Sequence, residues 1–117
     1  MSDHVVGEAR PLPAFELPYY VVVFSSVRRP GDQGYGETAE RLDEMVRDVP
    51  GYLGHESART PGGLGITVSY FSDVAAIEEW RAVGEHRDAQ KLGRAEWYEQ
   101  YTVHIAKVER SHGFVRG

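Results

Sequence analysis

The chain has 117 residues, a formal net charge of −5 and no cysteine. This length is typical of one domain. The missing cysteines exclude disulfides, thiolate metal sites and a cysteine nucleophile, and they fit a reducing compartment. No basic patch of the kind that binds nucleic acid is evident, and the longest apolar run, Tyr19 to Phe24, is far too short to span a bilayer. We therefore predict a cytoplasmic protein with neither nucleic acid nor a membrane as its partner.

The first segment, residues 1–18, carries prolines at three positions, and its run RPLPAFELP predicts an extended arm. Its apolar side chains Phe15 and Leu17 are expected to be anchored on a surface. Two interpretations of the arm stay open, because it could lie across a neighbouring subunit or be a frayed terminus.

A strand and a helix are expected next. Tyr19 to Arg28, YYVVVFSSVR, is rich in β-branched and aromatic residues and predicts a strand, and RPGDQGYG predicts the loop after it. From Tyr35 to Val49 the apolar residues recur at helical spacing with charges on the other face. Pro50 and Gly51 are expected to stop this helix.

A hairpin and a long helix follow. Residues 52–59 and 66–71 predict two strands, which the turn TPGGLG joins. Ser72 is a candidate N-cap for a continuous helix over residues 73–92, and Gly93 is expected to end that helix.

The rest of the chain predicts a short extra turn over residues 94–98, a last strand over 101–109 and a tail over 111–117. The element order βαββαβ predicts an α+β fold of the ferredoxin-like type over residues 19–110, with both helices on one face of a four-stranded antiparallel sheet. The other, apolar face would be bare. It predicts a homodimer related by a two-fold axis.

Four stretches of the sequence resemble the antibiotic biosynthesis monooxygenase family: YYVVVFSSVR, PGYLGHESAR, GITVSYFSDVAAIEEW and EHRDAQKLGRAEWYEQYTVHIAKVER. The resemblance covers about residues 19–110 and implies a dimeric α+β barrel. It implies three alternative functions. They are oxidation of a quinol- or anthrone-type aromatic by dioxygen without a metal or flavin, binding and degradation of haem, and ligand binding without catalysis. Because this fold hosts several chemistries, the site has to decide between them.

The resemblance also places a pocket between the second helix and the sheet, with Trp80 at the position of the family's helix tryptophan. Trp80 is then either a core residue or an aromatic wall for a flat ligand. His86 is the leading candidate for a general base, because an imidazole titrates in the range that suits proton transfer. On a continuous helix His86 would point roughly 120° away from Trp80. A surface histidine is the alternative.

Gln90 argues against haem. The resemblance puts it where the haem-degrading branch has its iron-binding histidine, and glutamine is a poor haem ligand. That branch also has an asparagine on the first strand, where this sequence has Ser25 and Ser26. We therefore expect no cofactor, with haem as the disfavoured alternative.

Other polar-tipped side chains are candidate contacts for a small aromatic substrate, because a hydroxyl or N–H group can orient a phenolic oxygen. They are Ser25, His55, Tyr70, Gln90, Trp97 and Tyr101. Each could equally lie in solvent or at the edge of the core. Arg81 and Arg94 are either counter-charges for an anionic ligand or solvated helix charges.

The histidines lack metal-ligand spacing, so no metal site is expected. No glycine-rich nucleotide loop follows a strand, so no flavin, nicotinamide or ATP site is expected either. The leading prediction is a cofactor-independent, monooxygenase-like homodimer that oxidises an electron-rich aromatic.

Overall fold

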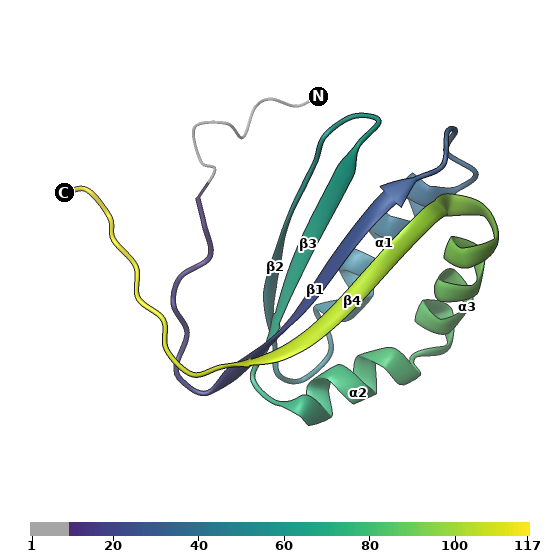
Figure 1. The fold of residues 1–117 in the computed structure, drawn as a ribbon. Helices are drawn as coiled ribbons and strands as arrows, with labels where there is room; N and C mark the ends of the chain where they lie inside the picture. The colour runs from purple at the N-terminus through teal and green to yellow at the C-terminus, as the bar shows by residue number, and fades with distance from the viewer. Residues whose placement is uncertain (1–9) are drawn as a thin grey trace.

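The computed structural model describes residues 10–117, and it places the helices on one side of a twisted sheet (Figure 1). The elements run in this order: β1 (Tyr19–Arg28), α1 (Tyr35–Val46), β2 (Tyr52–Arg59), β3 (Leu64–Phe71), α2 (Val74–Ala82), α3 (Gly84–Leu92), the π-helical turn η2 (Gly93–Trp97) and β4 (Tyr98–Val108). None of the helices in residues 10–117 has the length and hydropathy needed to cross a membrane.

The four strands lie in the order β2-β3-β1-β4, and every neighbouring pair is antiparallel. This confirms the predicted α+β, ferredoxin-like arrangement. The hairpin between β2 and β3 is also confirmed. Its turn is closed by a hydrogen bond from the Gly63 amide to the Thr60 carbonyl and contains Gly62 at a φ of 72°, a conformation that glycine adopts without steric cost.

The hydrophobic core lies at one end of the space between helices and sheet. It consists of Val46, Val49, Phe71, Ala76 and Ile77, contributed by α1 and the turn after it, by β3 and by α2. Trp80 packs against this cluster from the side of α2. The other end of the same space, under α3, holds the cavity described below.

The predicted helix over residues 73–92 is wrong in one respect, because it is broken at Val83. This residue has extended backbone angles, φ −62° and ψ 127°, and separates α2 from α3 (Figure 1). The low helix propensities of Val83 and Gly84 account for a break at this point. An exposed ion pair between Arg41 of α1 and Glu85 joins the start of α3 to α1.

One helix start also differs from the predictions. The N-cap of α2 is Asp73 and not Ser72, since the Asp73 carboxylate accepts a hydrogen bond from the Ala76 amide at 2.8 Å. Helix α3 ends at Leu92 with Gly93 as its C-cap, as predicted, although Gly93 is not in the left-handed conformation usual for a glycine cap. Gly93 keeps right-handed helical angles and begins η2, which corresponds to the predicted extra turn. Strand β4 consequently begins at Tyr98, earlier than expected.

Residues 10–18 of the N-terminal arm fold back onto the chain's own sheet. The Leu12 amide donates a hydrogen bond of 2.7 Å to the Glu56 carboxylate. Phe15 packs edge-on against Tyr19, with ring centroids 5.4 Å apart, and contacts Tyr70. The first nine residues of the arm lie outside the described part of the chain, and the placement of the arm across a neighbouring subunit stays a prediction.

The sheet keeps apolar side chains accessible at two places. Leu64 and Ile66 of β3 are exposed on the face opposite the helices, and Val103 and Ile105 of β4 are exposed on the helix side. Exposed apolar surface of this kind is typical of an interface. The homodimer stays a prediction.

Candidate functional site

A cavity of about 530 Å³ lies between the helices and the sheet. Its floor is the helix side of β1, β3 and β4, and its walls come from α1, α2, α3 and η2. Most of its lining is apolar or aromatic, including Val22, Phe24, Tyr35, Leu42, Phe71, Ile77, Trp80, Trp97, Tyr98, Tyr101, Val103 and Ile105. This size and composition suit a flat organic ligand.

Trp80 and His86 form a stacked pair in the cavity wall. Their ring centroids are 4.4 Å apart and their planes differ by 16°. The break at Val83 produces this contact, since the chain turns between the two residues and brings His86 back onto the indole. The prediction that His86 points away from Trp80 is therefore wrong, for the same reason that the continuous helix is wrong.

The surroundings of His86 define its protonation state. Burial lowers the pKa of His86 below its usual 6.5, an effect partly opposed by the backbone hydrogen bond to Trp80 and reinforced by the charge of Arg81. The imidazole is therefore neutral at pH 7. Its Nδ1 lies 3.1 Å from the Trp80 carbonyl oxygen. A carbonyl only accepts, so Nδ1 carries the hydrogen and Nε2 is left with a free lone pair. His86 has the form that a general base requires.

Aromatic rings occupy the end of the cavity nearest η2. Phe24 lies 5.3 Å from Tyr98 and 5.2 Å from Tyr101, measured between ring centroids. Burial, with the neighbouring Tyr35 adding to it, raises the pKa of Tyr98 well above its usual range. The Tyr98 phenol therefore stays neutral. Its hydroxyl is already hydrogen-bonded to the side chain of Tyr35.

Trp97 is buried and lines the cavity, but its indole N–H is already hydrogen-bonded within the protein. The indole Nε1–H donates to the Gln33 carbonyl oxygen at 2.9 Å, and the Trp97 carbonyl accepts from the Arg28 guanidinium at 3.1 Å. The ring also packs edge-on against Tyr35. Trp97 thus contributes an apolar wall and connects η2 to the loop after β1.

Five of the predicted site residues meet at the cavity, namely Trp80, His86, Gln90, Trp97 and Tyr101. Three do not. The strand register puts Ser25 and Tyr70 on the opposite face of the sheet, and the Tyr70 hydroxyl donates to Glu56 at 2.8 Å. His55 lies on the helix side but beyond the cavity, where its Nδ1 is 2.5 Å from the Tyr52 hydroxyl and its Nε2 is 3.8 Å from Asp43.

Sequence reasoning missed Tyr35 and Phe24 as cavity residues. A signal was present for both. Tyr35 begins the stripe of α1 that continues through Ala39 and Leu42, so it faces the sheet with them. Phe24 alternates with Val22 on β1, and both point to the side that the helices cover.

Gln90 does not supply a haem ligand. Gln90 is an exposed amide on α3 at the edge of the cavity, and an amide is not among the usual axial ligands of haem iron. Of the described residues that line the cavity, only His86 carries an imidazole. Within residues 10–117, no three His, Asp or Glu side chains are grouped so that they could hold a metal ion.

Comparison with known proteins identifies the fold and the family. YqjZ, an uncharacterized protein of Bacillus subtilis (strain 168), is 52% identical over 99 residues, which span 85% of this chain and 87% of YqjZ. The crystal structure of protein SO0527 from Shewanella oneidensis matches with a TM-score of 0.67 at 19% identity, over 77% of this chain and 90% of that chain.

SnoaB from Streptomyces nogalater, a cofactor-independent oxygenase, also matches with a TM-score of 0.67, at 12% identity, over 80% of this chain and 95% of SnoaB. At such identities these two structures establish the fold alone. Residues 18–92 match the antibiotic biosynthesis monooxygenase family. With that match and a relative sharing half of its residues over most of its length, the chain belongs to the antibiotic biosynthesis monooxygenase family.

Proposed function

We propose that this protein oxidises an electron-rich aromatic compound of the quinol or anthrone type with dioxygen, without a cofactor, and that His86 is its general base. The observation that carries the proposal is the stacked Trp80–His86 pair, with a neutral imidazole whose Nε2 is unprotonated, in the wall of an aromatic cavity. Membership of the family and the likeness in fold to the cofactor-independent oxygenase SnoaB support it.

The proposed reaction begins with proton transfer. For an anthrone, His86 Nε2 takes a proton from the activated CH₂ group, and the resulting anion delocalises over the aromatic rings. The anion gives one electron to dioxygen, and recombination of the two radicals forms a C–O bond. Collapse of the peroxide then yields a carbonyl and water. The balance is R₂CH₂ + O₂ → R₂C=O + H₂O, in which the substrate supplies all the electrons.

The other cavity residues have supporting roles in this scheme. Trp80 stacks on one face of the imidazole and fixes its orientation. Tyr98 stays neutral and contributes an uncharged aromatic ring to the cavity wall. Apolar walls keep water away from the reactive anion.

The cavity is open on one side. Val103 and Ile105 line the cavity and yet are 45% and 47% exposed, so the cavity is open along β4. The proposed homodimer would cover exposed sheet surface, and we retain a cytoplasmic location on the basis of the cysteine-free sequence.

Dioxygen consumption with a panel of anthrones and quinols tests the proposal. We expect turnover by the wild type and a loss of about 10²- to 10⁴-fold in kcat for His86→Gln, the range typical of a general base. His104→Gln is the matched control, because His104 is an exposed strand histidine outside the cavity lining. Equal rates for His86→Gln and wild type would exclude His86 as the base.

Titration with haem distinguishes the alternative. A Soret shift that disappears in His86→Gln, together with oxidation of the bound haem by dioxygen and a reductant, would replace the present proposal. Binding of an aromatic without oxygen consumption would leave a ligand-binding protein of the same fold.

A further inference from the structure

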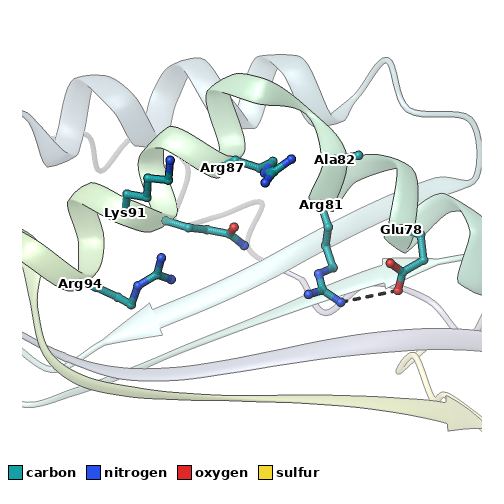
Figure 2. Close-up of a pocket in the computed structure, with 7 residues that line it drawn as sticks. Glu78, Arg81, Ala82, Arg87, Lys91 and Arg94 are labelled. Carbon is teal, nitrogen blue, oxygen red and sulfur yellow. Dashed lines mark ion pairs between the residues drawn. The ribbon is translucent and has the colours of Figure 1, made fainter.

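A second hollow, of about 380 Å³, lies in the angle between α2 and α3. Figure 2 shows the side chains of Arg81, Arg87, Lys91 and Arg94 gathered around it, with Glu78 at one end. Four cationic groups and one carboxylate give this hollow a local charge of +3 (4 − 1), in a chain whose net charge is −5. Four of the thirteen Lys and Arg residues of this acidic protein thus line one hollow.

Most of this positive charge is not neutralised by the protein. Arg81 pairs with Glu78, at 3.6 Å. Within residues 10–117, no ion pair joins Arg87, Lys91 or Arg94 to a carboxylate. These three residues follow one another at spacings of four and three along α3 and η2, so they lie on one side of the helix and repel one another. An anion bound between them would relieve that repulsion.

The basic hollow adjoins the aromatic cavity. Arg81 and Gln90 line both of them. Arg94 Nη1 donates to the Tyr101 hydroxyl at 3.3 Å, and Tyr101 lines the cavity. A ring held against Trp80 would therefore direct a substituent on its edge toward these cations.

We propose that the basic hollow recognises an anionic substituent, of the carboxylate class, on the aromatic ligand that occupies the cavity. This anion site depends on the proposed function in one respect, namely that an aromatic ring occupies the cavity. It does not require that the protein convert the ligand. Arg81, Arg87, Lys91 and Arg94 supply the positive charge, and Arg is well suited to bind a carboxylate with two parallel hydrogen bonds. The substrate class is thereby narrowed from any electron-rich aromatic to an acidic one.

The test compares two probes with the same ring, 2-naphthoate and 2-naphthalenemethanol, which differ in charge. Binding to ¹⁵N-labelled protein is followed by the indole N–H signals of Trp80 and Trp97, the two tryptophans of the chain, both of which line the cavity. For the wild type in 20 mM salt we expect naphthoate to bind at least tenfold more tightly than the alcohol. Salt at 0.5 M should shrink that preference by screening.

The variant pair gives the decisive comparison. Arg87→Gln/Lys91→Gln should lose the preference for naphthoate while its Kd for the alcohol stays within twofold of wild type. Arg47→Gln/Arg110→Gln removes the same amount of charge from exposed positions outside both hollows and should keep the preference. An equal loss in the two double variants would overturn the proposal, as would equal affinities of the two probes for the wild type.

The outcomes separate this inference from the proposed function. A naphthoate preference in a protein that consumes no dioxygen supports the anion site and removes the oxygenase. If the protein consumes dioxygen with neutral and acidic aromatics alike but shows no preference for naphthoate, the oxygenase is supported and the anion site is overturned. Failure of both probes to shift either indole signal overturns the anion site together with the aromatic occupant of the cavity.

Discussion

His86 illustrates how a single backbone change alters the chemistry of a residue. Its identity as the candidate base could be predicted from the sequence, but its contact with Trp80 could not, because the contact depends on the extended conformation of Val83. The hydrogen bond to the Trp80 carbonyl, which selects the tautomer, depends on the same turn. Both features follow from the path of the chain between the two residues.

The buried position of His86 predicts a pH-dependent stability. Because the unfolded chain binds a proton at His86 near pH 6.5 and the folded chain does so only at lower pH, acidification favours the unfolded state. The contribution of His86 to the free energy of unfolding is therefore present above pH 6.5 and lost as the pH falls through the folded pKa. Urea unfolding between pH 8 and pH 5 should show this loss in the wild type.

In His86→Gln the same titration should be flatter over that interval, since no imidazole remains to take up the proton. His104→Gln should keep the wild-type slope, because His104 is an exposed residue of β4. If His86→Gln and wild type lose stability in parallel between pH 6.5 and pH 5, burial of His86 does not disfavour its charged form.

Tyr70 shows that a chemically suitable side chain need not lie at the cavity. Its hydroxyl is chemically suited to a substrate contact, yet strand alternation puts it on the face opposite the cavity, bonded to Glu56. Burial and the nearby Glu56 raise the pKa of Tyr70 to about 12. A shifted tyrosine pKa is thus found outside the cavity as well as inside it, and only placement separates Tyr70 from Tyr98.

Among the elements, the four strands and α1 could be predicted well, since strand alternation and helical periodicity both appear directly in the sequence. The region from α2 to η2 could not, because a helix, a break, a second helix and a π-helical turn share one run of helix-forming residues. The signals for the break are weak by themselves. They are a β-branched residue followed by a glycine, with no proline.

Two glycine substitutions, one at the start of α3 and one beside the start of α2, test whether the backbone requires glycine at these places. Gly84 has no unusual φ, and a Cβ added there would meet no atom within 4 Å. Gly84→Ala should therefore raise the free energy of unfolding by about 0.4–1 kcal/mol, because alanine restricts the unfolded chain. Urea unfolding measures the change.

Gly51 is the contrasting control. Its φ is 93°, and a Cβ would lie 2.7 Å from the Ser72 hydroxyl and 2.9 Å from the Ala76 side chain at the start of α2. Gly51→Ala should lower the free energy of unfolding by about 1–3 kcal/mol. If Gly84→Ala is also destabilising, the bend between α2 and α3 depends on glycine at that position.

At the scale of the whole molecule, the sheet order and the side covered by helices agree with the prediction. The resemblance placed a pocket between the second helix and the sheet, but the extent of the cavity could not be predicted, since it depends on how α3 packs against α1, α2 and η2 above the sheet. The prediction of a homodimer depends on the apolar residues of β3 and β4 that stay exposed on the sheet.

Light scattering tests the dimer. We expect a particle of twice the 13.1 kDa chain mass at micromolar concentration. Ile66→Lys should shift the equilibrium to monomer, because Ile66 is 41% exposed on the sheet face without helices and a buried lysine would be costly there. Val74→Lys, at a position of α2 that is 44% exposed, is the matched control and should leave the mass unchanged. A monomeric wild type would contradict the prediction.

The placement of the two tryptophans has a spectroscopic consequence. Trp97 is buried and bonded to a backbone carbonyl, whereas Trp80 is half-buried and stacked on an imidazole. Their fluorescence therefore reports on partly different events. Emission from Trp97 follows unfolding of the loop after β1 and of η2 and, because Trp97 also lines the cavity, the presence of a ligand. Emission from Trp80 follows occupancy of the cavity and the charge of His86. A Trp97→Phe variant would make the intrinsic fluorescence of this protein a direct reading of its site.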